Sequence, residues 1–190
     1  LKDTIKEGSN VGFDGNVFSV EMVKDMEKEF KSKKISLKIE KDLINVLWED
    51  RPEMPQGSVF LHEVKYAGKS RIQKLSEVRE EMKRKGANYY LLTSLDDIAW
   101  TFNIRGKDIP HSPMAMAFSI ITLDNAYLYL QDGTYDETMI EAYKNDGVGI
   151  RSYDDIYLDT KRLSGQVLVD LSTINYAIYS VIDCEIMDGS

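Results

Sequence analysis

A single cysteine among 190 residues is the first constraint that this sequence sets. Cys184 has no second cysteine to pair with, so no internal disulfide can form, and a reducing compartment such as the cytoplasm is expected. The neighbours of Cys184 are mostly apolar. We therefore interpret it as a buried, unreactive thiol rather than as a nucleophile.

Long apolar runs and clusters of basic residues are missing as well. No apolar stretch approaches the ~20 residues that a membrane-spanning helix needs, and the first residues carry no signal-peptide pattern. The formal charge of −8 and the pI near 4.9 argue against a nucleic-acid partner, because neutralising phosphates requires clustered Lys and Arg. The short basic run at residues 31–34 suits the carboxyl end of a helix.

What the sequence does contain is a composition ordinary for a globular protein. Hydrophobic residues make up 43% and charged residues 29%, which is enough to build a core. The length suits one domain, or one domain with part of another. Because the chain starts at Leu1 and not at a methionine, we expect it to be a piece of a longer protein.

Strand and helix patterns alternate along the chain. Ser70 to Gln73 forms a capping box at the start of a helix that Gly86 ends, and Asp124 with Asn125 separates two apolar runs as a hairpin turn does. This order predicts an α/β fold with a mixed sheet. Strands are predicted at residues 11–14, 35–39, 89–93, 116–123, 126–130, 148–152 and 166–169, and helices at 19–30, 43–48, 70–86, 136–144, 154–162 and 174–182, with a further helix from Ser94 through Trp100.

A weak internal repeat runs through this pattern. Residues 11–19 can be aligned with residues 167–175, and each stretch reads as a strand, an aspartate, a short loop and a helix-capping residue. The offset of 156 residues, from Val11 to Val167, is about the length of one domain. We therefore expect residues 1–46 to be the tail of a first domain that has a second copy after it.

A proline-containing joint follows that tail. Two prolines three residues apart, within residues 50–55, favour an extended, stiff connection. We assign residues 47–56 to the joint and residues 57–190 to the second domain. A rigid hinge is the preferred role, and a simple linker charge is the alternative for the arginine. The candidate interdomain residues of the joint are Trp48, Asp50, Arg51 and Pro52.

Four stretches follow one another along most of the chain. They are Asn45-Val-Leu-Trp-Glu-Asp-Arg-Pro52, Tyr66-Ala-Gly-Lys-Ser70 with Lys74-Leu-Ser-Glu-Val-Arg79, Asp97-Ile-Ala-Trp-Thr-Phe-Asn-Ile-Arg-Gly-Lys-Asp108, and Ser112-Pro113. Taken in this order, they resemble the amino-terminal half of the long-form Xaa-Pro aminopeptidases (aminopeptidase P) of the creatinase/prolidase superfamily. The residues before Asn45 depart from the family pattern, whereas Trp48 to Pro52 retain it.

The resemblance implies a three-domain enzyme. Its two related amino-terminal domains share a ribonuclease-H-like α/β fold, a mixed sheet flanked by helices. Its third, pita-bread domain holds two divalent metal ions, usually manganese, and removes the N-terminal residue that precedes proline. Those ions need two Asp, one His and two Glu, and they activate a bridging water. His62 and His111 do not lie in such a pattern, so we expect this chain to carry no catalytic residue, no metal ligand and no cofactor.

The same resemblance implies the partners and the candidate site. The partners are the parent's own catalytic domain and a peptide with proline in second position, and a homodimer is compatible with the family. Trp100, Arg105 and Asp108 are the candidate entrance or interdomain residues. Trp100 either packs in the core or forms a wall of the substrate entrance. Arg105 either pairs with Asp97 or Asp108 to hold its loop, or faces the catalytic domain.

One departure from the family concerns substrate contact. The family's first domain carries an Asp-Gly-Arg-Tyr motif whose arginine reaches the peptide-binding cleft. The equivalent stretch here is Asp132-Gly-Thr-Tyr135. Thr134 stands in the place of the arginine and cannot make a charged bidentate contact, so this contact is not expected from the present chain.

Two other function classes compete with this reading. A nuclease would use carboxylates at strand ends, but the repeat assigns Asp14 and Asp170 to different copies, so turn or cap roles are favoured. A non-enzymatic protein-interaction module is the stronger alternative, because the same architecture occurs in proteins that have lost the metals, such as a histone-chaperone subunit. Metal ligands downstream of Ser190 would decide between the peptidase and the module.

Overall fold

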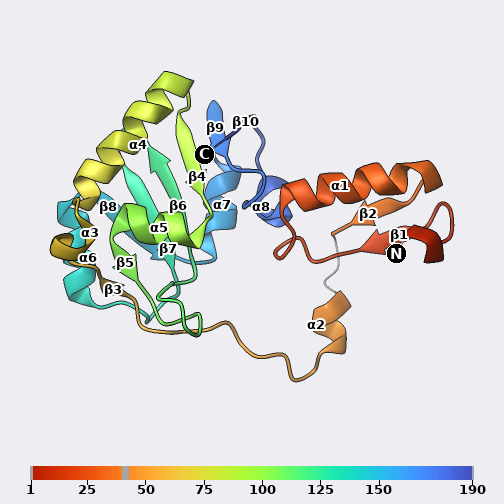
Figure 1. The fold of residues 1–190 in the computed structure, drawn as a ribbon, viewed down its shortest axis with the longest axis horizontal. Coiled ribbons are helices and arrows are strands. Elements are labelled where there is room, and N and C mark those ends of the chain that lie inside the picture. The colour runs from red at the N-terminus through yellow and green to blue at the C-terminus, as the bar shows by residue number, and fades with distance from the viewer. Residues whose placement is uncertain (1, 40–42, 190) are drawn as a thin grey trace. The chain divides into compact units, whose positions relative to one another are not determined.

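The computed structural model describes residues 2–39 and 43–189. Within them the chain divides into two compact units (Figure 1). Unit 1 comprises the residues up to Glu53 together with Leu171–Val181, and unit 2 comprises Met54–Asp170 and the residues from Ile182 onward. None of the helices in the described parts of the chain is long and apolar enough to cross a membrane.

Unit 2 is built on a mixed sheet. The strands of unit 2 are β3 (Phe60–Leu61), β4 (Tyr89–Leu92), β5 (Ile104–Arg105), β6 (Ala117–Thr122), β7 (Ala126–Leu130), β8 (Val148–Ser152), β9 (Gln166–Val169) and β10 (Glu185–Asp188). Of these, β3 and β5 form a separate two-stranded sheet. The helices of unit 2 are α3 (Val64–Ala67), α4 (Arg71–Lys85), α5 (Leu95–Phe102), α6 (Glu137–Asn145) and α7 (Asp155–Lys161). Six strands pair in the order β10-β9-β4-β6-β7-β8, with β4 parallel to β9 and antiparallel to β6. The mixed sheet predicted from the sequence is confirmed.

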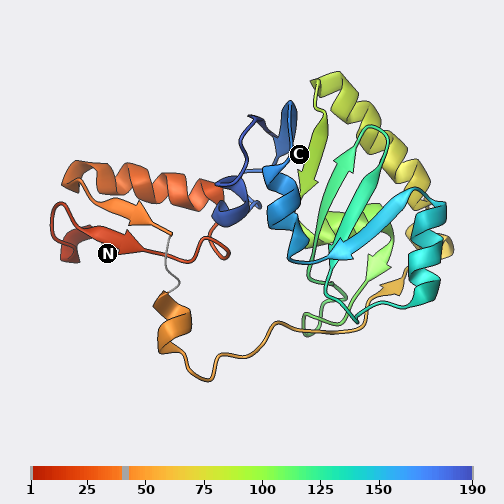
Figure 2. The ribbon, with the colours of Figure 1, turned by 180° about the vertical axis from the view of Figure 1, so that it is seen from behind.

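Helices cover both faces of this sheet. Residues paired across neighbouring strands point to the same face, so Tyr90, Ile121 and Leu168 share one face. Apolar side chains of α4, α5 and α6 pack into the core on that face. On the other face, the Tyr129 hydroxyl of β7 donates a hydrogen bond to Asp159 of α7 at 2.9 Å. α5 accordingly lies in front of the sheet in Figure 1, and α7 in Figure 2.

Burial raises the pKa of several tyrosines in this unit. The pKa of Tyr90 rises to about 12, and the pKa values of Tyr129, Tyr143 and Tyr153 rise too, with desolvation as the first cause in each. A raised pKa means that the folded state keeps a proton which the unfolded state loses above about pH 10. The stability from these groups is complete below that pH and is lost as the pH rises through the folded values.

We therefore expect the free energy of unfolding to fall steeply above pH 10, by about 1.4 kcal/mol per pH unit for each such tyrosine. Urea titrations between pH 9 and 11.5 measure this slope. Tyr153→Phe should make this slope shallower by the contribution of one tyrosine. The difference in slope between Tyr153→Phe and the unsubstituted chain cancels the contributions of the other titrating groups. These include Lys74, whose lowered pKa acts in the opposite direction. Equal slopes for the two proteins would contradict the expectation.

Unit 1 is smaller and contains a strand–helix–strand element. Its elements are the 3₁₀ helix η1 (Lys2–Thr4), β1 (Asn10–Gly12), α1 (Val20–Phe30), the 3₁₀ helix η2 (Lys31–Lys33), β2 (Ser36–Lys38), α2 (Leu43–Leu47) and α8 (Tyr176–Tyr179). β1 and β2 pair in parallel, with α1 as the connection between them. The basic run predicted to end a helix is η2, which follows α1 directly, so that prediction is confirmed.

The two repeated stretches cap their helices in the same way. Ser19 accepts a hydrogen bond from the Met22 amide at the start of α1, at 3.3 Å. Asn175 accepts one from the Ile178 amide at the start of α8, at 2.8 Å. Both the caps and the donors are separated by the 156 residues that relate the repeats. A side-chain acceptor at this position satisfies an amide that the helix itself leaves unpaired.

The repeated stretches also bond to each other within unit 1. Ser19 and Asn175 form an antiparallel bridge. Around it the amides donate in reciprocal pairs: Val20 to Ile174 and Tyr176 to Phe18, then Glu21 to Leu171 and Ala177 to Gly15, at 2.9–3.1 Å. Within each pair of bonds, the two donor residues are 156 positions apart, and so are the two acceptor residues. This is the pattern of a twofold, self-complementary contact, and it gives the repeat a structural basis.

Two predictions at the end of the chain are wrong. The final helix, predicted at residues 174–182, is α8 and ends at Tyr179. The strand β10 follows and was not predicted, although it adds to the sheet in parallel beside β9. Cys184 precedes β10 directly and is partly exposed, not buried, because it lies in the connection to an edge strand whose outer residues face solvent. Partial burial, together with Asp183, still raises the pKa of its thiol.

Candidate functional site around Trp100

The helix α5 presents Trp100 to solvent. Ser94 caps the helix by accepting from the Asp97 amide at 3.4 Å, and the helix ends at Asn103, which has a left-handed φ of 51°. Ile98 and Phe102 face the core, whereas Trp100 is 48% exposed. Positions two apart on a helix point in different directions. The interpretation of Trp100 as a core residue is therefore wrong.

A buried lysine supports this tryptophan. Lys74 of α4 is only 1% exposed, and its Nζ donates to the Trp100 carbonyl at 2.8 Å and to Asn103 Oδ1 at 2.6 Å. Nζ also lies 4.4 Å from the centre of the Trp100 ring. Asn103 Nδ2 in turn donates to the Lys69 carbonyl at 2.9 Å. The ammonium thus satisfies the carboxyl end of α5, where a cation is favoured.

This arrangement was not predicted from the sequence. Burial lowers the pKa of Lys74, with smaller contributions from Arg105 and Lys69. Lys74 lies one turn into α4, a place where a lysine is usually solvated, and its partners are 26 and 29 residues away in the chain. No local pattern indicates such a contact. The only available signal was its position one residue before Leu75, on the edge of the apolar face.

Arg105 makes neither of the ion pairs proposed for it. Its guanidinium donates to the carbonyl oxygens of Ala99 at 3.2 Å and Ile104 at 2.7 Å. Among the described residues no ion pair joins Arg105 to Asp97 or Asp108. The reason is that the Asp108 carboxylate is directed at backbone amides, while carbonyls at the end of α5 lie close to the guanidinium.

Asp108 ties two distant segments together. Its Oδ1 accepts from the Gly57 amide at 2.7 Å and its Oδ2 accepts from the Met116 amide at 2.6 Å. The residue is 7% exposed. A Cβ at Gly57 would lie 2.5 Å from the Lys107 carbonyl carbon, so the close approach requires glycine. We call this the Asp108 contact; it fixes the chain that enters unit 2 against the loop before β6.

The residues of the joint are mostly exposed. Trp48 is 47% exposed, and Asp50 and Pro52 are exposed as well. Arg51 Nη2 lies 4.0 Å from Asp14 Oδ2 within unit 1. Asp14 Oδ1 also accepts from the Asn16 amide at 2.9 Å, which confirms the turn role predicted for it.

Thr134 is held by its own loop. Its hydroxyl donates to the Gln131 carbonyl at 2.7 Å, and its carbonyl accepts from the Val59 amide at 2.7 Å. The residue is buried. The Thr134 side chain is therefore used to hold its own loop.

The described residues do not fit a metal centre. His62 stacks on Tyr66 with ring centres 5.9 Å apart, and His111 is exposed in a loop with a φ of 63°. Across residues 2–39 and 43–189, no three His, Cys, Asp or Glu side chains gather closely enough to hold a metal ion.

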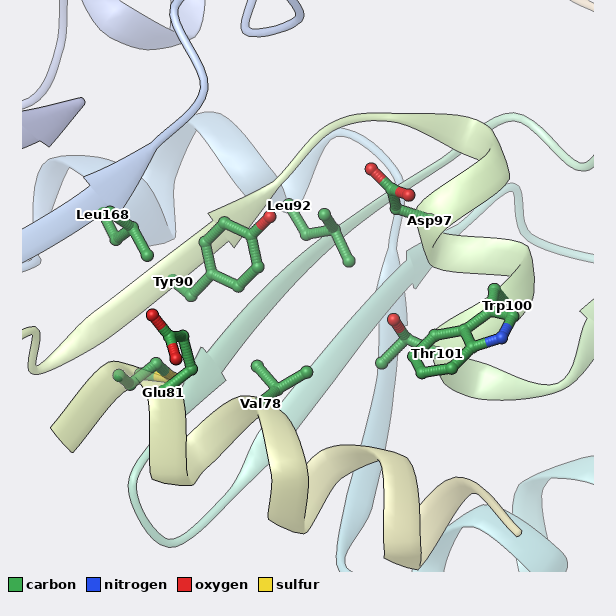
Figure 3. A pocket seen from close by; sticks show the side chains of 9 residues that line it. Val78, Glu81, Tyr90, Leu92, Asp97, Trp100, Thr101 and Leu168 are labelled. Carbon is green, nitrogen blue, oxygen red and sulfur yellow. The ribbon is translucent and has the colours of Figure 1, made fainter. Parts of the chain in front are cut away.

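A pocket of about 270 Å³ opens beside Trp100 (Figure 3). Val78 and Met82 of α4, with Leu92 and Leu168 of the sheet, give it apolar walls. The polar lining residues are Glu81, Tyr90, Asp97 and Thr101. Figure 3 shows the Tyr90 hydroxyl and the Asp97 carboxylate toward one end and Glu81 toward the other.

The two ends of the pocket differ in charge. Glu81 is already neutralised by its helix neighbours Arg84 and Lys85. Asp97 makes no ion pair with any residue of the described parts of the chain. Burial raises the pKa of Tyr90 to about 12, and Asp97 and Asp170 add to that rise. At neutral pH the Asp97 end therefore offers a carboxylate and an un-ionised phenol.

The comparison with known proteins agrees with the fold. The family model of the creatinase/prolidase N-terminal domain matches residues 50–189. The chain belongs to this family. It is 32% identical over 186 residues to "Aminopeptidase P2" of Arabidopsis thaliana, covering 95% of this chain and 26% of that protein. It is 33% identical over 160 residues to a "Probable Xaa-Pro aminopeptidase P" of Neurospora crassa, covering 83% of this chain and 23% of that protein.

A solved structure matches the present chain over its whole length. The X-prolyl aminopeptidase of Caenorhabditis elegans, described as a cytosolic enzyme with a di-nuclear active site, superposes with a TM-score of 0.88 at 25% identity. The superposition covers 100% of the present chain and 33% of that enzyme. The chain thus spans about a quarter to a third of the proteins it matches, and the resemblance to Xaa-Pro aminopeptidases drawn from its motifs is confirmed.

Proposed function

We propose that this chain is a non-catalytic N-terminal region of a metal-dependent Xaa-Pro aminopeptidase. The parent would be a cytoplasmic hydrolase that removes the N-terminal residue from peptides with proline in second position, using two divalent ions, manganese in our proposal, in another domain. The observation that carries the proposal is the match of the entire chain to one third of the C. elegans enzyme. The lack of a fitting ligand set in the described residues is consistent with it.

The proposed domain organisation follows the repeat. Residues 1–46 would be the tail of a first domain, 47–56 the joint and 57–190 the second domain. The reciprocal hydrogen bonds around Ser19 and Asn175 support this division, because equivalent residues of the two repeated stretches donate and accept them. The family model, which begins at residue 50, supports it as well.

The proposed role of this region is to limit access to the active site and to contribute to subunit packing. A rigid region in front of a catalytic domain favours short, unfolded peptides. Trp100 and Arg105, at the carboxyl end of α5, and the joint residues Trp48 and Arg51 are our candidates for contact with the catalytic domain or the substrate. The exposed indole of Trp100 supports this choice, because large exposed aromatic side chains are enriched in binding surfaces.

A protein-interaction module without peptidase activity is the second candidate. The exposed Trp100 beside a pocket favours it, since such a surface can bind a partner whether or not an active domain follows. The net charge of −8 is also compatible with a basic partner.

The reading frame downstream of Ser190 separates the two candidates. We expect it to encode two Asp, one His and two Glu in the order of the pita-bread domain, and we expect calorimetry on the 190-residue chain to show no stoichiometric Mn²⁺ binding. A downstream domain without those ligands would leave the interaction module. Tight binding of one or two Mn²⁺ per chain would refute the claim that this region is non-catalytic.

A further inference from the structure

The pocket beside Trp100 has the size of a side chain. Its volume of about 270 Å³ lies below the range of about 300–1,000 Å³ that is usual for small-molecule and cofactor sites. A dinucleotide or a large cofactor would not be enclosed. A single long side chain, brought by a partner protein, is an occupant of fitting size.

The walls of the pocket suit an aliphatic stem. Val78, Met82, Leu92 and Leu168 supply apolar surface on the floor and sides. Long charged side chains often bury their methylene groups against such surface and keep the charged head in a polar place. The apolar part of the pocket lies between Glu81 and Asp97 in Figure 3, so a stem laid along it would reach the Asp97 end.

The Asp97 end suits a planar cation. Asp97 is a carboxylate without an ion-pair partner among the described residues, and the neutral Tyr90 hydroxyl and Trp100 ring stand near it. A guanidinium can bond a carboxylate through two N–H groups and stack on an aromatic ring, which an ammonium does less well. Lys74 is buried, so its ammonium leaves the exposed part of the Trp100 ring available.

We propose that this pocket is a docking site for an arginine side chain of a partner protein segment, with the aliphatic stem against Val78 and Leu92 and the guanidinium between Asp97 and Trp100. Charge complementarity carries the choice of occupant, because the Glu81 end is neutralised and the Asp97 end is not. This inference does not depend on the peptidase assignment, since all lining residues belong to unit 2.

The test uses the 190-residue chain and matched peptides. Ac-Ala-Ala-Arg-Ala-Ala-NH₂ is compared with the same peptide carrying citrulline, which has the shape of arginine without its charge, and with one carrying leucine. Binding is followed by the indole N–H signal of Trp100 in ¹⁵N NMR spectra, assigned with Trp48→Phe. We expect the arginine peptide to bind about three- to fivefold more tightly than the citrulline peptide, the size expected for one exposed ion pair.

Two variants locate the effect. Asp97→Asn should remove the preference for arginine over citrulline. Asp96→Asn, which changes a neighbouring exposed carboxylate that does not line the pocket, should keep it. Thermal unfolding of both variants checks that they fold. Equal binding of arginine and citrulline, tighter binding of leucine, an equal loss in both variants, or shifts that spare Trp100 would each overturn the proposal.

Discussion

Replacing Asp108 with alanine should lower the free energy of unfolding by about 3 kcal/mol. The substitution leaves the Gly57 and Met116 amides without their acceptor. In the native protein both bonds are short and the carboxylate is buried. Hydrogen bonds to a charged group contribute about 1.5–3 kcal/mol each, and amides left unpaired in a buried place add a further cost. The expected loss is large because one side chain holds two segments that are 51 and 8 residues away in the chain.

Urea titration followed by circular dichroism measures this loss. Glu80→Ala, at an exposed carboxylate of α4, is the matched control and should change the free energy by less than about 0.5 kcal/mol. Asp108→Asn should lie between the two, because an amide keeps one acceptor oxygen but turns a donor toward the second amide. A loss below about 1 kcal/mol for Asp108→Ala would show that the Asp108 contact does not hold the entering chain.

Replacing Lys74 with methionine should cost about 2–3 kcal/mol. The variant keeps the length and most of the volume of the side chain, but it leaves the Trp100 carbonyl and Asn103 Oδ1 without their donor. Because the variant no longer buries an ammonium, the desolvation penalty of that charge disappears and offsets part of the loss. The expected cost is therefore smaller than the contribution of two charged hydrogen bonds. Trp100 should also become more mobile, because the cation against its ring is lost.

The same titration tests this, with Lys83→Met as the control. Lys83 is an exposed lysine in the last turn of the same helix, and its replacement should change stability by less than about 0.5 kcal/mol. Fluorescence anisotropy of Trp100 in a Trp48→Phe background reports the mobility of the indole. A neutral or stabilising effect of Lys74→Met would mean that desolvation of the ammonium outweighs its hydrogen bonds.

Local signals in the sequence predicted local features well. Ser70 and Gln73 form the capping box that their spacing indicates, and Gly86 ends α4 in a left-handed conformation with a φ of 78°. Thr122 and Asn125 close the hairpin turn between β6 and β7. Such features depend on residues a few positions apart, and the chemistry of caps and turns is read directly from residue type.

Contacts between distant segments were not predictable in the same way. The sequence drew attention to Asp108 and Trp100 but gave neither the partners of Asp108 nor the exposure of Trp100. Both depend on how α4, α5 and the entering chain pack, and no periodicity within a single element encodes that. The short strands β5 and β10 were missed because they gain their pairing from neighbours rather than from an alternating pattern of their own.

The repeat is the exception among distant features. Its signal lay in two stretches 156 residues apart, yet it pointed to residues that bond to each other around Ser19 and Asn175. Similar sequences fold into similar local shapes, and two such shapes can form a self-complementary contact. The sequence could indicate the equivalence of the two stretches, but not that they would meet.

The most direct test of the account is a peptidase assay on two proteins, the 190-residue chain and the full-length parent. Both are incubated with Mn²⁺ and a peptide that has proline in second position, and release of the N-terminal residue is measured. We expect release by the parent and none above the uncatalysed rate by the 190-residue chain. Release by the chain alone would contradict the central claim that this region is non-catalytic, and an inactive parent would favour the interaction module instead.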